Sequence, residues 1–167
     1  MANPMYGSNK LDNQLDSKVG KVVHFKPGSD GTAIADAESI VLTAADCGNY
    51  YFIDISANTC SVKLPDASTC KGGILTFIMD IPSDAEGTKD FILFTNSATE
   101  FLMGACFDGA GVHDQPSDDD MLTIDSSDGA VGAGDRVQVI SSGSHWFILE
   151  ASALTAGAWN EGTATRA

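Results

Sequence analysis

The side chains that most often carry out catalysis or bind metals are present in this chain, but they form no recognisable motif. The three histidines, His24, His113 and His145, are far apart, and none lies in an HExxH frame, which places two zinc ligands and a general base on one helix face. A GxSxG turn, which would expose a nucleophilic serine, is also missing. The sequence therefore predicts no catalytic residue, no metal ion and no cofactor, and a protein that is not an enzyme.

A group of acidic residues is the second candidate for chemistry. Asp118, Asp119 and Asp120 are consecutive, and Asp108 precedes them. Clustered carboxylates and loop carbonyls bind hard cations such as Ca²⁺, so a site around Asp108, Asp118 and Asp120 is one interpretation. The spacing does not follow the DxDxDG pattern of a calcium-binding loop. The favoured interpretation is a pair of solvated acidic loops.

Four cysteines complete the set of reactive side chains: Cys47, Cys60, Cys70 and Cys106. They contain no CxxC pair and no histidine at zinc-like spacing, so buried free thiols are favoured. A disulfide between Cys60 and Cys70, which flank one loop, remains open. The opening MANPMYGSNK has no charged n-region and no apolar h-region, so we expect no signal peptide and synthesis in a reducing cytoplasm. No apolar run approaches the ~18 residues of a membrane span.

The formal charge of −14 is unevenly distributed. Residues 1–28 hold four lysines and two aspartates, for +2, whereas the other residues hold 21 acids against five Lys or Arg, for −16. Binding to nucleic acid needs clustered Lys and Arg on one face, because affinity comes from counterion release. This distribution predicts no nucleic-acid partner. It favours a solvated acidic body that is attached to its partner through the N-terminal segment.

The strongest structural signal is the segment 135–150, DRVQVISSGSHWFILE, which is typical of a β-hairpin. Apolar and polar residues alternate in its first half, a Ser-Gly-Ser turn follows, and the return strand is rich in aromatic and β-branched residues. Trp146 and Ile148 face one side of that strand. Phe147 and Leu149 face the other. We expect a strand with two apolar faces either at the centre of a sandwich or half covered by another subunit.

Short strands recur through the rest of the chain, separated by Gly, Pro, Asn and Asp. We expect them over 22–25, 39–43, 50–55, 60–64, 73–81, 89–95, 100–107 and 120–124. A single helical turn is expected at 43–46, and a second hairpin around Asn96 and Ser97. With about ten short strands and almost no helical period, the sequence predicts an all-β fold, an antiparallel β-sandwich resembling a jelly roll.

Three parts are expected along the chain: an extended N-terminal arm over 1–28, a β-sandwich domain over 29–151 and a C-terminal tail over 152–167. The beginning of the arm is polar and lacks sustained periodicity, so a partner is needed to order it. Tyr6 and Trp159 are aromatic residues isolated in polar termini. Anchoring in a neighbour's pocket would offset the cost of exposing them.

Three segments together resemble a β module that recurs in virion-surface proteins of tailed bacteriophages. They are IVLTAADCGNYYFIDISANTCSVKLPDA at 40–67, GILTFIM at 73–79 and GDRVQVISSGSHWFIL at 134–149. In that module a strand leads into Thr-Ala-Ala-Asp-x-Gly, a second strand ends at Leu-Pro, and a Gly-Asp strand closes the module with a Trp-containing return strand. The likeness covers about two thirds of this chain.

The resemblance implies a binding or structural role, either as a capsid decoration (cement) protein or as a tail-fibre or receptor-binding module. The second role would use the loops 108–120 and 125–135 to recognise host-surface glycans. A fibre usually needs heptads or repeats, which the chain lacks, whereas a compact acidic body with arms suits a cement protein. We therefore expect a structural virion protein on the outer capsid surface, made in the host cytoplasm.

Capsid stabilisation would follow from binding to the major capsid protein, since many copies of a modest interface act together. We expect a homo-oligomer, with a trimer as the first choice, and no membrane partner. Lysines of the arm would meet acidic patches of the shell, and apolar side chains would act as anchors. The residues expected to contact the partner are Tyr6, Lys10, Leu11, Leu15, Lys18, Lys21 and Trp159.

Overall fold

The computed structural model shows a chain built mainly from short β-strands. It describes residues 20–25, 40–56, 58–81, 89–115, 119–125, 131–154 and 158–162. The strands in these ranges are β1 (Val22–Phe25), β2 (Ile40–Val41), β3 (Tyr50–Ile53), β4 (Cys60–Lys63), β5 (Ile74–Met79), β6 (Phe91–Phe94), β7 (Leu102–Asp108), β8 (Gly111–Gln115), β9 (Met121–Ile124), β10 (Arg136–Ser141), β11 (Trp146–Ser152) and β12 (Trp159–Gly162). Two turns of 3₁₀ helix accompany them, η2 (Ala44–Asp46) and η3 (Ala67–Thr69). The all-β prediction is confirmed.

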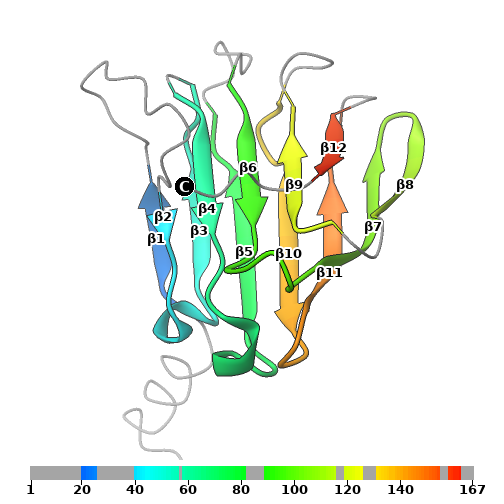
Figure 1. Cartoon of the computed structure of the whole chain (residues 1–167). Coiled ribbons are helices and arrows are strands. Elements are labelled where there is room, and N and C mark those ends of the chain that lie inside the picture. Colours follow the sequence, from blue (N-terminus) through cyan, green and yellow to red (C-terminus); the bar gives the residue numbers. More distant parts are fainter. Residues whose placement is uncertain are drawn as a thin grey trace, which may run out of the picture.

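The strands form two mixed sheets that share one hydrophobic core (Figure 1). The seven-stranded sheet has the order β1-β3-β5-β10-β11-β7-β8, and the five-stranded sheet has the order β12-β9-β6-β4-β2. In Figure 1 the five-stranded sheet lies in front, and β7 and β8 extend beyond β12 on the right. The architecture is sandwich-like.

The first six strands wind as a coil between the two sheets. Successive strands alternate between the sheets, so β1, β3 and β5 are parallel neighbours in one sheet, and β2, β4 and β6 are parallel neighbours in the other. Val22 pairs with Tyr50, and Tyr50 pairs with Thr76, so each turn of the coil stacks on the next. Parallel neighbours need a long crossover connection, which here includes a strand of the opposite sheet.

The prediction of an antiparallel sandwich is wrong for this coil, because its strands run parallel within each sheet. Alternation of apolar and polar residues indicates which side of a strand faces the core, but it carries no information on the direction of the neighbouring strand. Antiparallel pairing begins after the coil. There, β10 lies between β5 and β11, and β9 lies between β6 and β12.

The predicted hairpin over 135–150 is confirmed, but the one around Asn96 and Ser97 is wrong. β10 and β11 pair antiparallel along their length, with one bulge. β6 and β7, in contrast, belong to different sheets. The Thr95 hydroxyl donates to the carbonyl oxygen of Ser97 or Glu100, each 2.9 Å away, and folds the connection into a local turn. β7 then pairs with β11 and β8.

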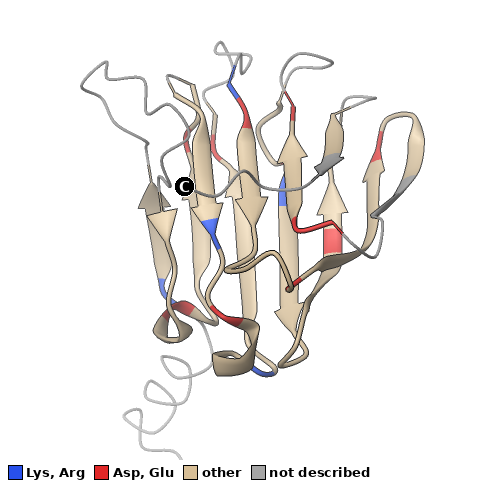
Figure 2. Cartoon of the chain, viewed as in Figure 1, with Lys and Arg blue, Asp and Glu red and all other residues tan. Residues whose placement is uncertain are grey.

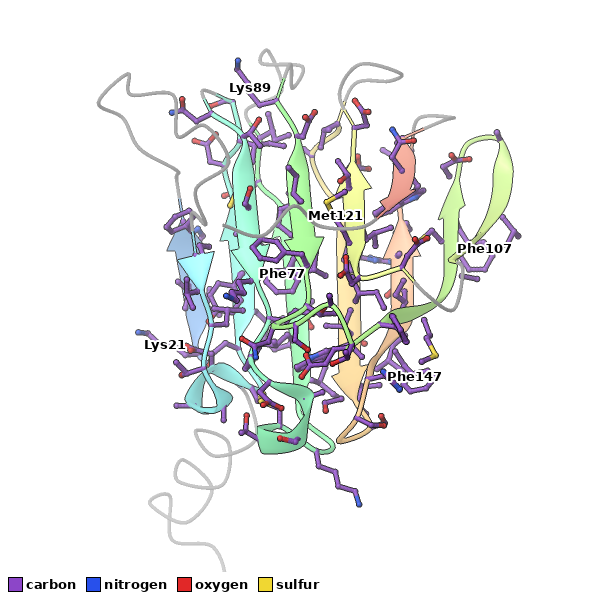
Figure 3. All side chains as sticks on the ribbon, viewed as in Figure 1. Lys21, Phe77, Lys89, Phe107, Met121 and Phe147 are labelled. Carbon is purple, nitrogen blue, oxygen red and sulfur yellow. The ribbon has the colours of Figure 1, made fainter. Side chains whose placement is uncertain are left out.

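Aromatic side chains join the two sheets at the centre of the core (Figure 3). Phe77 of β5 stacks on Tyr51 of β3, with ring centroids 5.5 Å apart, and its centroid lies 5.6 Å from that of Phe91 in β6. Trp146 of β11 is fully buried, and its Nε1 donates to the Pro65 carbonyl at 3.2 Å. Because β5 and β6 belong to opposite sheets, the contact between Phe77 and Phe91 fixes the spacing of the sheets.

Three turns are tied together at the lower end of the view in Figure 1, namely η2, η3 and the β10–β11 turn. The Ser141 hydroxyl donates to the Ala67 carbonyl at 2.7 Å, and the Gly72 amide donates to the Ser141 carbonyl at 2.8 Å. The amide of Gly48 donates to the Ile74 carbonyl at 2.6 Å, which anchors the segment after η2 to β5. The predicted helical turn at 43–46 is confirmed as η2.

β1 confirms the strand expected over 22–25, whereas no strand was expected where β12 lies; the two strands fall in the segments expected as the arm and the tail. β1 lies within the expected arm over 1–28 and pairs with β3. β12 lies within the expected tail over 152–167 and pairs with β9, from Trp159 opposite Ile124 to Gly162 opposite Met121. Both segments therefore contribute an edge strand to a sheet.

Gly104 and Gly111 offer a matched test of the packing between β7 and β11. Both have a positive φ, 140° and 145°, so alanine strains the backbone at either position by about 1–3 kcal/mol. A Cβ on Gly104 would also lie 2.8 Å from Ile148 Cβ, whereas one on Gly111 would meet nothing within 4 Å. In urea unfolding, we expect Gly104→Ala to lose at least about 1 kcal/mol more stability than Gly111→Ala. Equal losses would contradict the described β7–β11 approach.

Candidate partner-binding site

The structure describes two of the seven residues predicted to bind a partner. Lys21 is exposed and points away from the body at the base of β1 (Figure 3). Its backbone is fixed, since its amide donates to Asn49 Oδ1 at 3.0 Å and its carbonyl accepts from the Tyr50 amide at 2.9 Å. The other five predicted residues lie outside the described ranges; they are Tyr6, Lys10, Leu11, Leu15 and Lys18.

The prediction that Trp159 anchors a partner is corrected by its position in the fold. Its side chain is 4% exposed, and its Nε1 donates to the Phe107 carbonyl at 2.9 Å. A tryptophan that is buried and hydrogen-bonded within its own chain is not available to a neighbour's pocket. Trp159 instead helps to close the side of the core where β12 meets β7.

On the opposite side of the core, the described residues form a pocket of about 510 Å³ between β1 and β2. These two strands are the outermost strands of their sheets, and β2 has only two residues, so it covers little of the core beside it. Six of the ten lining residues are apolar, and four carry polar groups. The lining comprises Lys21, Val23, Phe25, Ile40, Val41, Leu42, Ala45, Asp46, Asn49 and Tyr51.

A network of hydrogen bonds holds the polar rim of this pocket in place. The Asp46 carboxylate accepts from the Thr43 amide at 2.9 Å, from the Thr43 hydroxyl at 2.8 Å and from the Tyr51 hydroxyl at 3.1 Å. Burial alone would raise the pKa of Asp46, but these hydrogen bonds outweigh it and lower the pKa. Burial raises the pKa of Tyr51 to about 12. The rim therefore presents a fixed negative charge next to Lys21.

Gly20, the residue before Lys21, crosses the turn that follows η2 at very short range. A Cβ built on Gly20 would lie 1.2 Å from the Gly48 carbonyl oxygen, so no side chain fits at this position. The chain thus enters the fold directly beside the pocket, pressed against the backbone of a neighbouring turn. Residues 1–19 are joined to the body at this point.

A second apolar surface lies on β7, β8 and β11 of the seven-stranded sheet. Phe147, Leu149, Phe107 and Val112 are 40%, 50%, 51% and 60% exposed. Figure 3 shows Phe107 and Phe147 at the side of the molecule formed by β7, β8 and β11. The strand β11 was expected to be covered on both apolar faces. The face with Trp146 is covered by the five-stranded sheet, whereas the face with Phe147 and Leu149 is exposed within the described part of the chain.

His145 and Asp108 have local structural partners in the described part of the chain. The His145 ring stacks on Phe101, and its Nδ1 accepts from the Phe101 amide at 3.3 Å. Asp108 accepts from the amides of Ala110 and Gly111 and so closes the β7–β8 turn. Among the described residues, no three His, Cys, Asp or Glu side chains are grouped closely enough to hold a metal ion. Asp118, which belongs to the cation site considered as one interpretation of the sequence, lies outside the described ranges.

Charges are sparse and mostly acidic over the described part of the molecule (Figure 2). Basic residues are scattered in Figure 2, while acidic residues gather at strand ends and connections. No helix in the described part has the length and hydrophobicity to cross a bilayer. Comparisons with protein-family models, with curated proteins and with solved structures found no match.

Glu100 is the buried acid that sequence reasoning did not single out. Its Oε1 accepts from the Ala67 amide at 3.2 Å, while its Oε2 is the one buried side-chain oxygen without a hydrogen-bond partner in the described residues. Burial raises the pKa of Glu100, and the negative charge of Asp66 adds to the effect. None of the described pockets is lined by Glu100, so its contact with η3 indicates a structural role.

Replacing Glu100 with glutamine tests this environment. The raised pKa means that the folded state holds the proton of Glu100 more tightly than the unfolded state, so wild-type stability falls as the pH rises above the ordinary value near 4.5. Gln is neutral at every pH. In thermal unfolding from pH 4 to 8, we expect Glu100→Gln to equal the wild type at low pH and to exceed it increasingly at higher pH.

Glu150→Gln is the matched control for that measurement. Glu150 is a half-exposed acid that pairs with Arg136 on the surface, and such pairs contribute less than about 1 kcal/mol. We expect its replacement to cause a small loss of stability and no gain towards higher pH. A Glu100→Gln variant that loses stability at pH 8 would show that the Glu100 carboxylate is favourably solvated, and would contradict a raised pKa for this buried acid.

Proposed function

We propose that this protein is a structural virion protein that decorates the outer surface of a bacteriophage capsid and cements it by binding the major capsid protein. The observation that carries the proposal is the apolar pocket between β1 and β2, which opens beside the point where residues 1–19 join the body. A sandwich-like acidic body with a partly apolar pocket at the root of the N-terminal segment suits a protein that this segment holds on a larger surface.

The proposed mechanism uses the segment and the pocket as one continuous contact surface. Lys10, Lys18 and Lys21 meet acidic patches of the shell or of an adjacent copy, and Leu11 and Leu15 supply apolar anchors. The acidic body remains outside, where its charge keeps it solvated and prevents non-specific association. Many copies, each with a modest interface, would stabilise the shell together, without any single tight contact.

We also propose that this sandwich-like domain is related to jelly-roll-like domains of virion surfaces. Several residues that carry the resemblance make defined contacts: Thr43 and Asp46 cap η2, Pro65 accepts the Trp146 hydrogen bond, and Asp135 accepts from the amides of Gly132 and Leu154.

Deleting residues 2–20 tests the role of the N-terminal segment. We expect the truncated protein to lose retention on expanded heads, measured by co-sedimentation with heads that lack the protein. The body should remain folded, as checked by circular dichroism and thermal unfolding, because the described core contacts begin at β1. A truncated protein that still decorates heads at the wild-type ratio would contradict the proposal.

Val41 and Val112 provide a matched pair for testing the pocket. Both are exposed valines on edge strands, 58% and 60% accessible, but Val41 lines the pocket and Val112 lies on β8, at the opposite edge of the seven-stranded sheet. We expect Val41→Asp to weaken binding to heads by more than about tenfold, since a buried aspartate is costly. Val112→Asp should change binding by less than about twofold. The reverse ranking would assign binding to the β7–β8 surface.

A glycan array separates the proposal from the alternative of a tail-fibre or receptor-binding module. Specific binding of the full chain to host-type glycans, together with no binding to heads, would favour host recognition. Binding to heads with no signal on the array would favour cementing. The loops expected to recognise glycans, 108–120 and 125–135, are described in part, and two of their described acids, Asp108 and Asp135, accept backbone hydrogen bonds within the chain.

A further inference from the structure

Two cysteines that are far apart in the sequence lie side by side where the coil turns. Cys47 follows η2, and Cys70 follows η3, so they occupy equivalent positions in two successive turns of the coil. A Cβ built on Gly73 would lie 2.6 Å from Cys47 Sγ and 2.8 Å from the Cys70 carbonyl oxygen. Both cysteines therefore flank one point above Gly73, where only a glycine leaves room.

The surrounding backbone holds this arrangement in place. The Gly73 amide donates to the Cys70 carbonyl at 2.6 Å, and the Gly48 amide donates to the Ile74 carbonyl at 2.6 Å. Burial raises the pKa of Cys47 to about 12, and the neighbouring Cys70 side chain adds to the effect. All four cysteines are free thiols, and the other two are buried within β4 and β7.

We propose that Cys47 and Cys70 are a dithiol site that closes to an intramolecular disulfide when the protein meets a small-molecule disulfide of the glutathione type. Cys47 is partly exposed, while Cys70 is 5% exposed, so Cys47 reacts first. The Cys47 thiolate attacks one sulfur of the oxidant and releases one glutathione thiolate. The Cys70 thiolate then attacks the Cys47 sulfur and displaces the second glutathione thiolate.

The electrons and protons of this exchange balance. The two cysteine sulfurs are oxidised, the oxidant disulfide is reduced to two thiols, and those thiols take up the two protons that the cysteines lose. The high pKa of Cys47 makes the first step slow at neutral pH and faster as the pH rises, since only the thiolate attacks. The site would remain reduced in a cytoplasm and close outside it.

The disulfide would tie one turn of the coil to the next. It closes the segment 47–70, which contains β3, β4 and η3, and it lies next to Ala45 and Asp46 of the pocket lining. By restricting the unfolded chain, a link over a segment of this length is expected to raise the Tm by about 5–10 °C. The inference does not depend on the proposed function.

The test treats the reduced full chain with excess oxidised glutathione at pH 8.5 and follows the intact mass, the Tm and a non-reducing peptide map. Cleavage before aspartate separates the cysteines, because Asp46, Asp54 and Asp66 place Cys47, Cys60 and Cys70 in different peptides, 46–53, 54–65 and 66–79. We expect the mass to fall by two hydrogen atoms, peptides 46–53 and 66–79 to be joined, and the Tm to rise.

Variants give the matched controls. Cys47→Ser and Cys70→Ser should each abolish the link and the rise in Tm, whereas Cys60→Ser should retain both. If Cys60→Ser fails to fold, the wild-type peptide map still decides between the pairs. A link between 54–65 and 66–79, a stable glutathione adduct on Cys47, a dimer joined through cysteine, or four thiols that survive the treatment would each overturn the proposal.

Discussion

The fold depends on one constraint, which is that parallel neighbours in a sheet cannot be joined by a tight turn. Each strand of the coil must cross to the opposite sheet before the chain returns beside its previous turn. The contact of Phe77 with Phe91 fixes the distance over which these crossings occur, because it lies between consecutive strands of opposite sheets. The turns η2 and η3 stack at one end for the same reason, and so do the two cysteines that follow them.

A coil of this kind has two open sides, and the chain treats them differently. On one side β10, β9 and β12 continue the sheets, and Trp159 closes the core by its hydrogen bond to the Phe107 carbonyl. On the other side β2 is too short to cover the residues between the edge strands, which leaves the pocket. Within the described residues, the apolar part of this pocket thus results from where the coil begins.

Local features of the fold could be predicted from the sequence, whereas the pairing of distant strands could not. The β10–β11 hairpin and the η2 turn depend on neighbours a few residues apart, such as Thr43 and Asp46. The pairing of Val22 with Tyr50 joins segments that alternation alone cannot match. The burial of Trp159 could not be predicted for the same reason, since its partner strand β9 lies well before it in the sequence. The pocket and the proximity of Cys47 to Cys70 likewise arise only from stacking of the coil.

The attachment of residues 1–19 through β1 has a mechanical consequence. β1 is an edge strand that pairs in parallel with β3 over four residues, and Gly20 and Lys21 join its first residue, Val22, to the segment proposed to hold the shell. A pull along the axis of β1 would load its hydrogen bonds to β3 in shear, so that they resist together. A sideways pull would unzip them one after another. A tether formed by residues 1–19, as proposed, would be strongest under tension along the strands and weakest under tension across them.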